Sequence, residues 1–120
     1  SKILFIMLVL RKEILDENQK IGYIESIFDS DNILKTTYFP NMKRLYIAFK
    51  RGETYSYGNI TQEIYDEFEK SESQGKFFHQ KIRNNKEFPY RKEFTLYPNE
   101  INEVNEVINN MKEKNENIDE

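Results

Sequence analysis

The chain contains no cysteine and only one histidine, His79, among its 120 residues. The lack of cysteine excludes disulfide bonds and thiolate chemistry. A single histidine is too few for a zinc site built from imidazole ligands. We therefore expect no metal ion and no other cofactor.

The sequence also lacks the common catalytic motifs. It has no P-loop, no G-x-G-x-x-G, no H-E-x-x-H and no G-x-S-x-G. His79 has no evident nucleophile or acid arranged around it as a catalytic base would. The carboxylates are scattered over helix-like segments, as solubility alone requires. We therefore expect that the protein is not an enzyme.

No hydrophobic run is long enough to cross a membrane. The longest, ILFIMLVL, covers Ile3–Leu10, whereas a spanning helix needs about 20 apolar residues. A signal peptide would need a small-residue cleavage site, and Arg11 and Lys12 follow instead. We expect a cytoplasmic protein whose residues 1–31 form an apolar strand or helix extension. This run suits core burial, with an interface to a second copy as the alternative.

Periodicity predicts an α+β fold. Apolar and polar residues alternate over three expected strands, at Ile33–Phe39, Leu45–Lys50 and Glu53–Tyr57. Thr61 then offers the N-cap of a first short helix, and Ser73 that of a second. The predicted architecture is a small antiparallel β-meander packed with two short helices and a C-terminal amphipathic helix.

The C-terminal part should cover this meander. Over residues 93–114 we expect an edge strand at Phe94–Tyr97, then the amphipathic helix with Asn99 as its cap. Residues 115–120 are expected to form a disordered acidic tail. The helix either covers the sheet or pairs with another chain.

The central segment carries an ordered set of motif residues. In chain order these are Leu45–Phe49, Gly52, Tyr55-Ser56-Tyr57, Tyr65 and Ser73–Arg83. The set resembles the KTSC domain, a small module named for its place at the C-terminus of some lysyl-tRNA synthetases. The resemblance covers about residues 32–92 and implies RNA binding, which has been suggested for the family. His79 stands where the family commonly has Asn, and the turn at Thr61 lacks the usual Pro.

Charge is unevenly distributed along the chain. Residues 35–92 carry 12 Lys and Arg against 7 Asp and Glu, whereas the remainder carries 6 against 14. Clustered cations are the electrostatic footprint of polyanion binding. A mixed solvated surface is the competing interpretation.

The candidate binding residues combine rings and cations: Tyr55, Tyr57, Lys76, His79, Lys81 and Arg83. Tyr55 and Tyr57 share one strand face and suit base stacking, although core packing also explains them. A helix N-terminus near Lys76 suits phosphate, although capping by Ser73 explains it equally well. Arg83 suits a bidentate phosphate contact, with an ion pair to acids of the first helix as the alternative.

Three functions fit these observations. The first is a non-catalytic module that binds RNA, single strands or another nucleotide-containing polyanion through a basic, aromatic face. The second is a small protein-interaction or inhibitor protein, of phage type and directed at a host enzyme or defence system. The third is a nucleotide-capturing small-ligand binder, formed within one chain or between two subunits of a homodimer.

Overall fold

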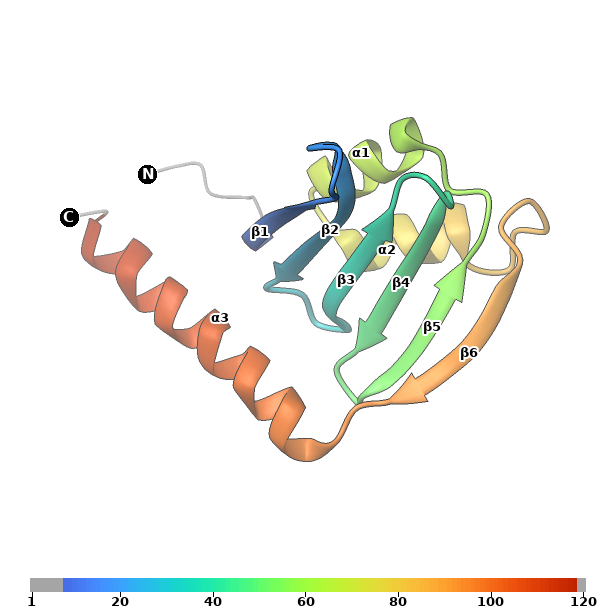
Figure 1. Cartoon of the computed structure of the whole chain (residues 1–120). Helices are drawn as coiled ribbons and strands as arrows, with labels where there is room; N and C mark the ends of the chain where they lie inside the picture. The colour runs from blue at the N-terminus through green and yellow to red at the C-terminus, as the bar shows by residue number, and fades with distance from the viewer. Residues whose placement is uncertain (1–7, 119–120) are drawn as a thin grey trace.

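The computed structural model describes residues 8–118, and its centre is one antiparallel sheet (Figure 1). Each strand pairs with the next in the chain, so the spatial order is β1-β2-β3-β4-β5-β6. The strands are β1 (Leu8–Leu15), β2 (Ile21–Phe28), β3 (Ile33–Phe39), β4 (Arg44–Phe49), β5 (Glu53–Tyr57) and β6 (Tyr90–Thr95). The expected α+β class and the meander are therefore confirmed, with strands added on both sides of the expected three.

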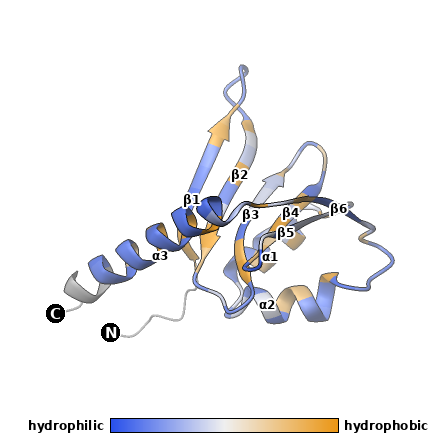
Figure 2. Ribbon diagram, turned by 90° about the horizontal axis from the view of Figure 1, so that it is seen from below, coloured by the Kyte–Doolittle hydropathy of each residue, from blue (hydrophilic) through white to orange (hydrophobic). Residues whose placement is uncertain are grey.

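Two groups of helices accompany the sheet. Between β5 and β6 the chain forms α1 (Gln62–Lys70), α2 (Gln74–Phe77) and a π-helical turn, η1 (Phe78–Ile82). After β6 comes the long helix α3 (Pro98–Ile118), which Figure 1 shows apart from α1 and α2. Figure 2 shows that hydrophobic residues gather on the strands, whereas most of α3 is hydrophilic. Within residues 8–118, no helix is long and apolar enough to cross a membrane.

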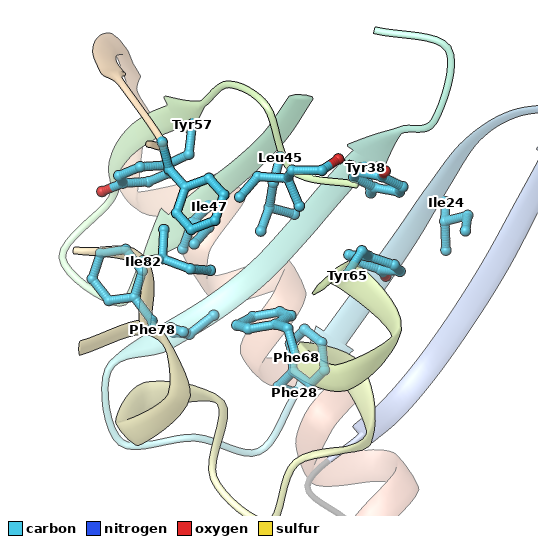
Figure 3. Packing of buried hydrophobic residues seen from close by; sticks show 13 residues of the cluster. Ile24, Phe28, Tyr38, Leu45, Ile47, Tyr57, Tyr65, Phe68, Phe78 and Ile82 are labelled. Carbon is cyan, nitrogen blue, oxygen red and sulfur yellow. Dashed lines mark hydrogen bonds between the residues drawn. The ribbon is translucent and has the colours of Figure 1, made fainter. Parts of the chain in front are cut away.

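The larger core lies between the sheet and α1, α2 and η1 (Figure 3). Tyr38 of β3 and Tyr65 of α1 stack face to face, with ring centroids 4.3 Å apart and planes 3° from parallel. Phe28 meets Phe68 edge to face at 5.7 Å. These rings are fully buried, and buried aromatic pairs of this kind hold an element in place beyond the effect of their area alone. They fix the helical layer on the sheet.

A smaller core joins α3 to the opposite sheet face. Val104 and Ile108 of α3 pack with Leu34, Ala48 and Leu96. The apolar stripe predicted for the C-terminal helix therefore faces the sheet. α3 contacts β1, β2 and β3, so Phe39 and Tyr46, farther along the same face, remain half-exposed.

Both predicted caps of the short helices are confirmed. The Thr61 hydroxyl accepts a hydrogen bond from the backbone N–H of Ile64 at 3.3 Å, and α1 begins at the next residue. The Ser73 hydroxyl accepts from the N–H of Lys76 at 3.2 Å. Each bond satisfies one of the free N–H groups at a helix start.

Two C-terminal expectations were wrong. The edge strand is β6, Tyr90–Thr95, and not Phe94–Tyr97. The last helix begins at Pro98, so Asn99 lies inside it, and the side chain of Glu100 instead accepts from the N–H of Tyr97 at 2.8 Å. Proline suits a first helical position because its missing N–H needs no partner there. The helix is assigned as far as Ile118; the disorder expected from residue 115 stays a prediction.

The apolar N-terminal run is described only in part. Leu8, Val9 and Leu10 begin β1 and are half-buried, and two of them, Val9 and Leu10, pack against the smaller core. Residues 3–7 of the run, and residues 119–120 of the expected tail, lie outside the described residues. The sequence predicted a strand or a helix here, and Leu8–Leu10 form a strand.

Candidate nucleic-acid interface

The π-helical turn η1 positions the cationic side of the site. In this turn the backbone N–H of Arg83 donates to the carbonyl of Phe78, five residues earlier, at 2.8 Å. π-turns are rare and occur frequently at functional sites. This turn buries Phe78 and Ile82 against the sheet and leaves His79 and Arg83 exposed.

Tyrosines of β5 and β6 form the opposite wall. Tyr57 of β5 pairs in register with Tyr90 of β6, and the ring of Tyr90 lies 5.9 Å from that of Tyr55 and 6.4 Å from that of Tyr57. Exposure increases along this row: Tyr57 is 6% exposed, Tyr55 is half-buried and Tyr90 is 66% exposed. Rings two residues apart share a strand face, as predicted for Tyr55 and Tyr57.

Tyr57 serves the core and the wall together. Its ring packs edge to face on Phe78 at 5.3 Å, and its hydroxyl lies at the edge of the cluster, away from Leu45 (Figure 3). Burial raises the pKa of Tyr57 to about 12, an effect that Tyr55 reinforces and the positive charge of Arg83 opposes. The core-packing interpretation is therefore right for Tyr57, whereas Tyr55 keeps an accessible face.

An open depression separates the two walls. One hollow of about 350 Å³ lies among Tyr55, Tyr57, Tyr90 and Arg83. A second hollow, of about 490 Å³, continues past Arg83 to the turn between β4 and β5. The two share the lining residues Phe49, Glu53, Phe78 and Arg83. We call this continuous depression, with its tyrosine wall and its Arg83 wall, the Tyr–Arg groove.

Arg83 makes no ion pair with any described residue. Its Nη1 lies 3.4 Å from Nδ1 of His79, one turn earlier. The alternative of an ion pair with acids of α1 is therefore wrong; Glu69 of α1 instead binds Arg11, with Nε to Oε1 at 2.9 Å. The guanidinium faces the groove with hydrogen-bond donors that a phosphate or carboxylate can accept.

Comparison with known proteins agrees with this architecture. The sequence model of the KTSC domain matches residues 29–88, half of the chain. The chain belongs to the KTSC domain family. The fold is also similar to the crystal structure of a KTSC domain protein from Yersinia pestis, at 24% identity and a TM-score of 0.51, covering 71% of this chain and 100% of that one. At that identity the likeness supports the fold alone. No curated protein matches the chain.

Two lysines of the KTSC domain contribute unequally to the groove. Lys76 lines a third hollow with Ser73 and His79, and this hollow adjoins the second hollow of the groove, with which it shares Asp31, Asn32, Gly75 and His79. Because the Ser73 hydroxyl already accepts the Lys76 N–H, capping explains this short helix start and no phosphate is required. Lys81 is exposed and lines neither hollow of the groove. The structure thus brings together Tyr55, Tyr57, His79 and Arg83, places Lys76 at the adjoining hollow and leaves Lys81 outside.

Sequence reasoning missed several groove residues. Tyr90 is not among the candidates named from the sequence, and it follows the segment that matches the KTSC domain. Lys50 and Arg51 belong to the turn between β4 and β5, and Glu53 begins β5; all three line the groove. To place Tyr90 at the groove one must know that it pairs with Tyr57, and this pairing follows only from the position of β6.

Proposed function

We propose that this KTSC domain binds single-stranded nucleic acid, and RNA in particular, in the Tyr–Arg groove. The observation that carries the proposal is the exposed Tyr90 ring beside Tyr55, facing the unpaired guanidinium of Arg83 across an open depression. Proteins that bind single strands combine such rings with a cationic track for the backbone. The groove holds both elements on facing walls.

The chemistry divides between the walls. Bases stack on Tyr55 and Tyr90, and each base–aromatic stack contributes on the order of 1–3 kcal/mol. Phosphates lie against Arg83, whose planar guanidinium makes bidentate contacts that a lysine cannot. Lys50 and Arg51 extend the cationic track along the second hollow. Because stacking is indifferent to base identity, these contacts give affinity without selecting a sequence.

The proposal is tested with a fluorescently labelled uridine hexamer, whose anisotropy is followed while protein is added. We expect saturable binding that weakens steeply with salt, with a log–log slope of about −2 if Arg83, Lys50 and Arg51 each release one counterion. A duplex of the same length should bind more weakly, since its bases are not free to stack.

Two other results would overturn the proposal. Binding that does not change with salt would rule out phosphate contacts at Arg83. Competition by uridine monophosphate as effective as that by the hexamer would instead favour capture of a single nucleotide, because then only one stacked base and one phosphate contribute.

A further inference from the structure

Glu53 is a carboxylate in a groove that otherwise suits a polyanion. It is the first residue of β5 and shares the face of Tyr55, since strand residues two apart point the same way. It lines both hollows of the groove, and its side chain is half-buried. A negative charge at this position weakens phosphate binding. The Glu53 carboxylate therefore suits a contact with another part of a ligand.

The Glu53 side chain has no hydrogen-bond or ion-pair partner among residues 8–114, whose side chains the structure describes. Other half-buried carboxylates on the sheet and α1 are matched: Glu25 lies 3.8 Å from Lys35, Glu69 pairs with Arg11, and Glu93 accepts from Ser56 and pairs with Arg91. Glu53 therefore keeps both oxygens free as acceptors. A partly desolvated acceptor without a partner is well suited to receive N–H donors from a ligand.

The spacing fits a base stacked on Tyr55. Residues two apart on a strand are separated by about 6.5–7 Å. A base that lies on the Tyr55 ring and extends toward the start of β5 places its polar edge at the Glu53 carboxylate. The four bases differ at that edge. Guanine presents two adjacent donors, N1–H and N2–H, which match the two carboxylate oxygens, whereas cytosine and adenine offer a single amino group beside an acceptor and uracil a single ring N–H between two carbonyls.

We propose that Glu53 reads the base held on Tyr55 and makes the groove prefer guanine. This inference rests on the proposed nucleic-acid binding and adds base selection to it. The acceptors of adenine and uracil next to the donor would face the carboxylate and be repelled. A bidentate pair of this kind discriminates against the wrong base by about 5- to 100-fold in affinity.

The test compares uridine hexamers that contain one guanosine, inosine, adenosine or cytidine at the same position. Wild-type protein should bind the guanosine hexamer about 5- to 100-fold more tightly than the all-uridine hexamer, with inosine between them because it lacks the N2 amino group. In Glu53→Gln the preference should disappear while the all-uridine hexamer binds at least as well. The matched control is Asp31→Asn, which removes an equal charge from the same groove at an exposed residue and should keep the preference.

Each remaining outcome contradicts the inference in a distinguishable way. Equal binding of all hexamers by wild type overturns guanine selection and leaves single-strand binding standing. Equal loss of preference in Asp31→Asn and Glu53→Gln assigns the effect to net charge and overturns the role of Glu53. Failure of wild type to bind any hexamer overturns both proposals.

Discussion

The rings of Tyr55 and Tyr90 lie 5.9 Å apart, tilted by 54°, at the edge of the sheet. Tyr55 belongs to the segment that matches the KTSC domain, whereas Tyr90 comes from the strand that follows it. The tyrosine wall is therefore completed by β6, which pairs with β5 alone and leaves its other edge free within the described sheet.

Replacing Tyr90 by alanine should weaken binding of a uridine hexamer. Tyr90 is 66% exposed and supplies the most accessible ring of the groove. Loss of one base stack corresponds to about 1–3 kcal/mol, which anisotropy titration would detect. The matched control is Tyr97→Ala, because Tyr97 is 72% exposed and lines neither hollow of the groove. An equal loss in both variants would contradict the assignment.

Replacing Arg83 by alanine should reduce both affinity and its dependence on salt. Arg83 has no carboxylate partner among the described residues, so its removal leaves no charge unpaired in the protein. The log–log salt slope should fall in magnitude by about 0.7, the share of one phosphate contact on a single strand. Lys81→Ala removes an equal charge from the same turn, outside the groove, and should leave the slope nearly unchanged. Identical slopes for wild type and Arg83→Ala would refute a phosphate contact.

Replacing Tyr65 by phenylalanine should destabilise the fold. The Tyr65 hydroxyl donates to Oε2 of Glu69 at 2.8 Å and lies 3.1 Å from Oγ of Ser26, which also binds Glu69. Phenylalanine keeps the stack on Tyr38 but leaves the largely buried Glu69 with one donor fewer. Hydrogen bonds to charged groups contribute about 1.5–3 kcal/mol, measurable by urea denaturation. Tyr97→Phe, on an exposed residue, should change stability by less than about 0.5 kcal/mol.

Stability should decline in alkaline solution because buried tyrosines resist ionisation. Burial raises the pKa of Tyr38 and of Tyr57 to about 12, against about 10 in an unfolded chain. Below about pH 10 both states keep these protons, so the contribution of the two tyrosines to stability does not change with pH. Between about pH 10 and 12 the unfolded state loses the proton first, so the free energy of unfolding falls as pH rises.

Tyr57→Phe isolates one part of this effect. Urea denaturation at about pH 9 and about pH 11 should give a smaller drop for Tyr57→Phe than for wild type, because the variant has one tyrosine fewer to ionise on unfolding. Tyr97→Phe should follow wild type. A drop of unchanged size in Tyr57→Phe would show that the Tyr57 hydroxyl ionises equally well in the folded protein.

The strands that sequence predicted correctly each have a buried face. β3 and β5 begin and end where the alternation of apolar and polar residues indicated, because one side of each strand is covered. β6 has no such face; all its residues except Glu93 are exposed. The position of β6 is set by its pairing with β5, a contact between segments far apart in the chain. Sequence periodicity cannot predict such a contact.

The site was predictable in its residue types and less so in its geometry. Tyr55, Tyr57, His79 and Arg83 do meet at one groove. Lys81 lies outside it because it is two residues from both His79 and Arg83, and helical residues two apart point to nearly opposite sides. The question of whether Arg83 forms an ion pair with α1 depended on how η1 sits against α1. The packing of η1 against α1 is tertiary structure, and the local sequence does not predict it.

The measurement that tests the central claim most directly is a two-dimensional NMR titration of the wild-type protein with a uridine hexamer. The sheet has a second set of half-exposed rings, Tyr23, Phe39 and Tyr46, on the opposite face, which serves as an internal comparison. We expect chemical-shift changes at Tyr55, Arg83 and Tyr90 and none at those three rings. Changes confined to Tyr23, Phe39 and Tyr46, or none at saturating hexamer, would contradict binding in the Tyr–Arg groove.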